Sequence, residues 1–146
     1  MTDTDRTAAA ATAGEKTGFR LGSGPGRVLV WFYGVFTVAA ASRSIVQMAL
    51  DFGRAPLAYV LSAVAALVYG FITYSLVRGG ERARRTALVC CAAELAGVLI
   101  VGTWTLVEPS AFADSTVWSY LGRDYLFIPV ILPVTGMIWL RRAKSA

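Results

Sequence analysis

Four long runs of apolar residues dominate the chain, and charged residues, glycine or proline separate one run from the next. Each run is close to or above the roughly 18 apolar residues that a transmembrane helix needs. The pattern therefore predicts four transmembrane helices, over about residues 28–50, 57–77, 86–107 and 125–140. Residues 1–26 have no such periodicity and are rich in Ala, Thr and Gly, which predicts a disordered tail ahead of one transmembrane domain over residues 27–146.

The fourth run is the shortest, and it contains two prolines. Pro129 and Pro133 lie one turn apart on the same face, which predicts a kink or a local opening of the backbone hydrogen bonds. Between the third and fourth runs, a cap at Asp114 or Ser115 and a stop at Gly122 predict a short helix at the membrane surface. The expected fold is all-α, a four-helix transmembrane bundle with a short interfacial helix between helices 3 and 4.

Composition points away from a soluble enzyme. Hydrophobic residues make up 56% of the chain and charged residues only 16%, whereas a soluble domain carries about 25% charge. The chain has no histidine, and its two cysteines, Cys90 and Cys91, are adjacent inside an apolar run. These two thiols are more typical of helix packing than of redox chemistry or palmitoylation. Motifs for redox, nucleotide or acyl-transfer chemistry are also missing, so we expect neither an enzyme nor a cofactor or metal.

Basic residues mark one side of the predicted bundle. Eleven of the fourteen lie in three clusters outside the apolar runs: Arg6, Lys16, Arg20 and Arg27; Arg78, Arg82, Arg84 and Arg85; and Arg141, Arg142 and Lys144. Four spans place all three clusters on the same side, and the positive-inside rule makes that side cytoplasmic. We therefore expect an inner-membrane protein with both termini in the cytoplasm. Arginines of the last two clusters are expected to attract anionic lipid headgroups, at about 1 kcal/mol each, and nucleic acid is not an expected partner.

Two charged residues lie inside the predicted spans, Arg43 in the first and Glu94 in the third. A charge at a helix centre costs roughly 2.5–3.5 kcal/mol, so both side chains are expected to face the bundle interior. We predict that they form an intramembrane ion pair, with Gln47 as a further hydrogen-bond partner of Arg43. In the alternative, Arg43 extends to the outer interface toward Asp51 and Glu94 is protonated.

This polar site supports two interpretations of function. An isolated pair of this kind more often fixes helix register than moves protons, so the leading prediction is a non-enzymatic accessory or interaction subunit. The alternative is a small transporter or channel that uses the Arg43/Glu94 pair. It would work as a homo-oligomer, because four helices rarely enclose a path.

Small and aromatic residues lead to three further predictions. Ser62, Ala66 and Gly70 repeat every four residues in the second span, and such a ladder permits close helix contact, inside the bundle or between subunits. Trp118 is expected in the aromatic belt at the outer interface. Tyr33, Tyr69 and Tyr74 line a ligand cleft or pack at an interface, and the sequence does not separate these two roles.

The apolar runs also resemble a group of known proteins. Similarity to the small four-span integral membrane proteins of actinobacteria is carried by the stretches YGVFTVAAASRSIVQMALDFGRAPLAYVLSAVAALVY, AAELAGVLIVGTWTLV and YLFIPVILPVTGMIWLRR, over about residues 27–142. The resemblance implies a fold and a location, and it places no catalytic residue on this chain. The small multidrug exporters are not similar, because they keep a glutamate in their first helix, which here contains Arg43.

Overall fold

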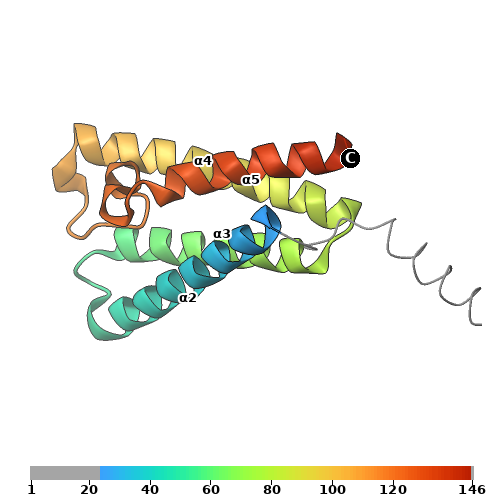
Figure 1. The fold of residues 1–146 in the computed structure, drawn as a ribbon. Helices are drawn as coiled ribbons and strands as arrows, with labels where there is room; N and C mark the ends of the chain where they lie inside the picture. Colours follow the sequence, from blue (N-terminus) through green and yellow to red (C-terminus); the bar gives the residue numbers. More distant parts are fainter. Residues whose placement is uncertain (1–23, 146) are drawn as a thin grey trace, which may run out of the picture.

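The computed structural model describes residues 24–145, which form a bundle of long α-helices (Figure 1). The helices are α2 (Pro25–Asp51), α3 (Pro56–Arg78), α4 (Glu81–Val107) and α5 (Ile128–Ser145), with two 3-10 helices, η1 (Pro109–Ala111) and η2 (Ser119–Tyr125), between α4 and α5. The described part of the chain is all-α, as predicted. The predicted tail lies outside the described residues except for its last three, and two of these, Pro25 and Gly26, already belong to α2.

Helix length and exposed side chains indicate a multi-pass membrane protein. Helices α2, α3 and α4 are long and apolar enough to cross a membrane, and a fourth span is present if η2 and α5 count as one segment bent by 95°. Large apolar side chains are exposed on the outer faces of these helices, for example Trp31 at 64%, Leu50 at 81% and Ile100 at 66%. A soluble protein rarely exposes so much apolar surface.

The helices form two adjacent hairpins, α2–α3, joined by a short turn, and α4–α5, joined by residues 108–127. Helix α2 packs against α3, α3 against α4, and α4 against α5, whereas α2 and α5 touch at only a few points (Figure 1). The start of α2, the α3–α4 turn and the end of α5 lie together, and we call this the basic end. The 52–55 turn and residues 108–127 form the opposite end, which we call the distal end.

Helix α4 begins five residues earlier than the predicted span. The expected start was residue 86, but the helix includes Glu81 and the arginines that come after it. Glu81 makes ion pairs with Arg84 at 2.8 Å and with Arg85 at 3.2 Å. Pairs at spacings of three and four residues stabilise a helix, so the basic cluster extends α4 instead of forming a loop.

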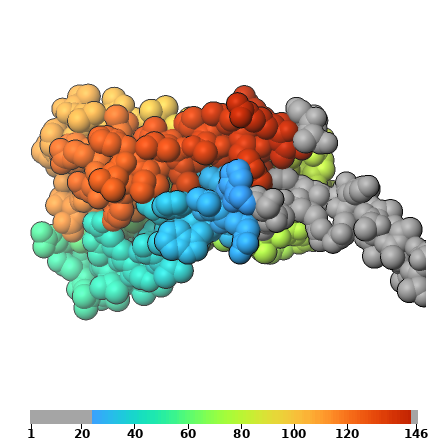
Figure 2. Space-filling view, in the orientation of Figure 1, coloured from blue at the N-terminus to red at the C-terminus, as the bar shows by residue number. Residues whose placement is uncertain are grey.

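Residues 108–127, the distal segment, do not form the predicted surface helix. Val117 and Trp118 are 2% and 4% exposed and belong to the main hydrophobic core. The backbone N–H of Trp118 donates to Thr116 Oγ1 at 3.1 Å, and that of Thr116 donates to Ser119 Oγ at 2.8 Å. In Figure 2 the segment, in orange, fills the distal end next to the α2–α3 hairpin. The surface prediction is wrong because side-chain hydroxyls satisfy the backbone of a segment that folds inward.

A left-handed turn anchors the distal segment on α4. Tyr120, Leu121 and Gly122 all have positive φ angles, of 51°, 60° and 78°. The backbone N–H of Tyr120 donates to the Thr105 hydroxyl of α4 at 2.8 Å. Leu121 lies directly on Gly102, where an added Cβ would be 2.5 Å from Leu121 Cδ2 and 2.7 Å from its backbone nitrogen. The missing side chain of Gly102 therefore makes the close contact between loop and helix possible.

The break in the last span lies before the prolines. Leu126 and Phe127 have positive φ angles of 56° and 59°, and the chain bends there by 95°. Pro129 falls in the first turn of α5, where a proline has no helical hydrogen bond to lose, and Pro133 lies inside the helix. The sharp bend therefore precedes both prolines, at 126–127, and is not a kink between them.

Substitution Gly102→Ala tests this anchoring. The added methyl group would meet the backbone of Leu121, so we expect a loss of about 1–3 kcal/mol of stability, as for other overpacked sites. Thermal unfolding in detergent measures the effect. Gly34→Ala in α2 is the matched control, because its Cβ would meet only Thr73 Cγ2 at 4.0 Å. Equal melting temperatures for the two variants would contradict the anchoring role of Gly102.

Candidate functional site

A carboxyl group occupies the centre of the bundle. Glu94, midway along α4, is fully buried. Its Oε2 accepts a hydrogen bond of 2.9 Å from the Tyr33 hydroxyl of α2, whereas its Oε1 has no hydrogen-bond partner among residues 24–145. The Tyr33 hydroxyl also lies 3.6 Å from Cys91 Sγ, and Gly136 of α5 lies next to it, since a Cβ there would be in van der Waals contact at 3.7 Å. Three helices therefore meet around one half-satisfied carboxyl.

A tyrosine and a tryptophan lie beside this carboxyl. Tyr69 of α3 is fully buried, and its ring centroid is 6.1 Å from that of Tyr33. The indole N–H of Trp118 donates to the Tyr69 hydroxyl at 3.1 Å. The Trp118 ring lies against Gly97, one turn beyond Glu94, where an added Cβ would be 2.9 Å from the ring. The distal segment thus contributes Trp118 to the interior, and the predicted place of Trp118 in the outer aromatic belt is wrong.

Arg43 is held by the distal segment. Its Nη1 donates to the Tyr125 hydroxyl and its Nη2 to the backbone carbonyl of Ser115, both at 2.8 Å. Its Nε donates to Gln47 Oε1 at 3.3 Å, one turn along α2. The residue is half-buried, and neutral acceptors bind each of its three guanidinium nitrogens. Gln47 is therefore a partner of Arg43, as the sequence predicted.

Arg43 and Glu94 do not form the predicted ion pair. Within residues 24–145, the partners of Arg43 come from α2 and the distal segment, and the partner of Glu94 is Tyr33. The prediction omitted the distal segment, which folds inward and offers acceptors nearer to Arg43. Arg43 also lies in the half of α2 toward the distal end, whereas Glu94 is at the middle of α4. The two polar groups are separate sites.

The arginines of the basic end fall into two groups. Arg84 is only 6% exposed; it pairs with Glu81 and donates to the backbone carbonyl of Leu140 at 3.3 Å, which ties α4 to α5. Arg85 is exposed but also pairs with Glu81. In the described part of the chain, the other five exposed arginines of this end make no ion pair with an acidic side chain: Arg27, Arg78, Arg82, Arg141 and Arg142.

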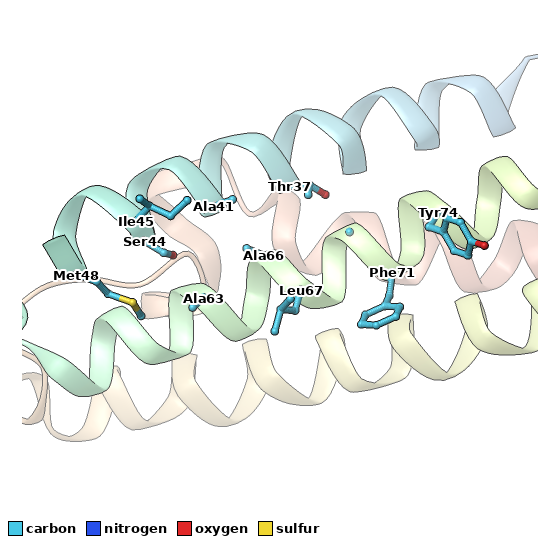
Figure 3. A pocket seen from close by; sticks show the side chains of 11 residues that line it. Thr37, Ala41, Ser44, Ile45, Met48, Ala63, Ala66, Leu67, Phe71 and Tyr74 are labelled. Carbon is cyan, nitrogen blue, oxygen red and sulfur yellow. The ribbon is translucent and has the colours of Figure 1, made fainter.

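A groove of about 550 Å³ opens between α2 and α3 on the outside of the bundle (Figure 3). We call it the α2–α3 groove and define it by its small and hydroxyl residues, Thr37, Ala41, Ser44, Ala63, Ala66 and Gly70. Both hydroxyls are already satisfied within α2: Thr37 Oγ1 donates to the Tyr33 carbonyl and Ser44 Oγ to the Ala40 carbonyl, each at 2.6 Å. The groove contains no charged residue. A third hydroxyl, that of Tyr74, lies at one end of the groove and accepts a hydrogen bond from Arg78 Nη1. The rest of the lining is apolar, so the groove is suited to an apolar occupant.

Sequence reasoning did not identify the roles of four side chains of these sites. Tyr33 and Tyr69 were left between two roles, Trp118 was assigned to the surface, and Tyr125 was not singled out. Gly97 and Gly102 of α4 face the distal segment, but in the sequence they resemble ordinary small residues of a membrane helix. Among residues 24–145, no group of three or more His, Cys, Asp or Glu side chains is arranged to hold a metal ion.

Comparisons with family models, with curated proteins and with solved structures gave no match.

A double-mutant cycle in detergent distinguishes the observed partners from the predicted pair. Arg43→Leu and Tyr125→Phe remove the two ends of one hydrogen bond, so their effects on stability should couple by about 0.5–3 kcal/mol. Arg43→Leu and Glu94→Leu share no partner, so their effects should add to within about 0.5 kcal/mol. Coupling in the second cycle and additivity in the first would restore the ion pair and contradict the observed hydrogen bonds.

Proposed function

We propose that the protein is a non-enzymatic subunit of a membrane assembly and that its α2–α3 groove receives a transmembrane helix of another membrane protein. The groove is the single observation that carries this proposal, because it is an open, uncharged recess along helices long enough to span a bilayer. The polar groups at the bundle centre, in contrast, are closed off by Tyr33, Tyr69 and Trp118. The α2–α3 groove, in contrast to these groups, is open on the side of the bundle.

Physical chemistry favours a helix as the occupant of this groove. Helices associate in bilayers mainly through close van der Waals packing, and small residues allow the backbones to approach. Ala41 of α2 and Ala63 and Ala66 of α3 form such a surface, as Figure 3 shows. Larger side chains, among them Leu67 and Phe71, border it and are more than half exposed. A second helix would cover these side chains and fill the recess between them.

The proposed orientation has the basic end in the cytoplasm of the cell, with the chain in the inner membrane and both termini on the cytoplasmic side. The described arginines support it, because seven lie at the basic end and two, Arg54 and Arg123, at the distal end. Both distal arginines lie near an acidic residue, with N–O distances of 3.8 Å to Asp114 and Asp124. This asymmetry is the pattern that the positive-inside rule describes.

Purification of the tagged full-length chain from an actinobacterial host in mild detergent tests the proposal. We expect a native mass above that of the monomer and a second membrane protein at fixed stoichiometry. Ala63→Leu fills the groove and should reduce the amount of that protein at least tenfold. Ala92→Leu is the matched control, because Ala92 is exposed on α4 and lines none of the grooves described. Melting temperatures check that both variants are folded.

Two outcomes would contradict the proposal. A monomer or a homo-oligomer without any other protein would remove the accessory role. A partner that both variants retain equally would place the interface elsewhere on the molecule.

A second function, a small oligomeric transporter or channel, is supported by one specific observation. Glu94 is a buried carboxyl with one unpartnered oxygen at the centre of the bundle, and ionisable residues in this position often belong to proton relays. Arg43 has no part in this version of the proposal, because its hydrogen bonds go to Gln47 and the distal segment. Tyr33 is the residue placed to exchange a proton with Glu94.

Proton flux into liposomes distinguishes this second function from the first. If Glu94 transfers protons, Glu94→Gln should reduce flux driven by a pH gradient to the level of empty liposomes. Glu108→Gln, at an exposed position of the distal end, is the matched control and should keep the full flux. Flux that survives Glu94→Gln, or wild-type flux no greater than that of empty liposomes, would remove this function.

A further inference from the structure

A second groove of about 550 Å³ lies at the basic end, beside the turn between α3 and α4. We call it the arginine groove and define it by Phe71, Tyr74, Arg78, Gly80, Arg82 and Thr86. Phe71 and Tyr74 are each 58% exposed and also border the α2–α3 groove. One wall of the arginine groove is therefore aromatic and continues along α3 toward the middle of the bundle, whereas its mouth carries charge.

Two cations at the mouth have no acidic partner among the described residues. Arg78 Nη1 donates to the Tyr74 hydroxyl, and its guanidinium carbon lies 5.8 Å from the centre of that ring. Arg78 is therefore held over the aromatic wall instead of extending freely. Arg82 is exposed, and its guanidinium group makes no ion pair with any acidic side chain of residues 24–145. The groove thus combines one arginine that is held against an aromatic ring with a second one that has no such contact in the described part of the chain.

The carboxylate in this groove does not cancel these charges. Glu81 lines the groove, but its oxygens accept hydrogen bonds from Arg84 at 2.8 and 2.9 Å and from Arg85 at 3.2 Å. Four arginines therefore face one acid in this turn, and the two that line the groove remain available. The first N–H groups of α4 add to the positive potential, because Gly80 provides no side-chain cap.

We infer that the arginine groove binds an anionic glycerophospholipid of the adjacent leaflet. The phosphate would accept hydrogen bonds from Arg78 and Arg82, and an acyl chain would run along Phe71 and Tyr74. A cationic mouth joined to an apolar wall complements a molecule with a charged head and a hydrocarbon tail, and a soluble anion would leave the aromatic wall uncovered. Of the six arginines predicted to contact lipid headgroups, this site uses two. Arg84 instead stabilises the packing of the helices.

This inference rests on the proposed membrane placement of the chain and not on the identity of a protein partner. The experiment is native mass spectrometry of the full-length protein released from mild detergent, with phosphatidylglycerol titrated against phosphatidylcholine. We expect the wild-type protein to retain phosphatidylglycerol selectively. The double variant R78Q/R82Q should bind it about thirtyfold more weakly, or about fivefold for each arginine.

The matched control is R141Q/R142Q, which removes the same charge from the same end but leaves the groove intact. Because all four arginines are exposed, both variants should fold, and their melting temperatures check this. Equal weakening in the two variants would mean a general basic surface without a site and would overturn the inference. Competition by inorganic phosphate at millimolar concentration would also overturn it, since the groove would then bind a free anion. A negative result here leaves the partner-helix proposal untouched, because co-purification tests that proposal separately.

Discussion

The hydrogen bonds of Arg43 are the constraint on which the distal half of the molecule depends. An arginine within a helix long enough to span a membrane needs acceptors, and the hydrocarbon core of a bilayer offers none. Tyr125 and the carbonyl of Ser115 supply them, each at 2.8 Å. Satisfying Arg43 thus fixes two points of the distal segment, ten residues apart, against α2. Thr105 and Gly102 fix the same segment against α4, so the segment joins the two hairpins at the distal end.

This arrangement leaves the two ionisable interior residues in different situations. Each guanidinium nitrogen of Arg43 donates to a neutral acceptor, and the residue is half-buried. Glu94 is fully buried, and within the described residues only one of its oxygens accepts a hydrogen bond. An unpartnered buried oxygen is energetically unfavourable. Glu94 is therefore less fully hydrogen-bonded than Arg43. Arg43 therefore stabilises the fold through its hydrogen bonds. Glu94 and Tyr33 are the interior groups to test for proton transfer.

The sequence predicts the helices well because each depends on a local property. Apolar run length locates α2, α3 and α4 to within about five residues, and Pro56 and Gly79 mark real helix ends. The distal segment depends on contacts with residues distant in the sequence. The local backbone preferences of its own residues predict a different conformation. Tyr120 and Leu121 disfavour positive φ, yet they adopt it because Gly102 and Thr105 hold them. The ion-pair prediction failed for the same reason, since the true partners of Arg43 in the distal segment lie 72 and 82 residues away.

Helix α3 shows why the open grooves could not be predicted. One of its faces, with Tyr69, Ile72 and Leu76, is buried in the core, and another, with Leu67, Phe71 and Tyr74, is exposed. In a soluble protein the exposed face would be polar, and the pattern of polarity would separate the two. In a helix surrounded by lipid both faces are apolar. Hydropathy therefore does not indicate which face packs against the other helices. The exposed face differs from the buried one in that it leads to Arg78 at the end of the helix. There the apolar surface of the bundle meets an arginine without an acidic partner in the described part of the chain.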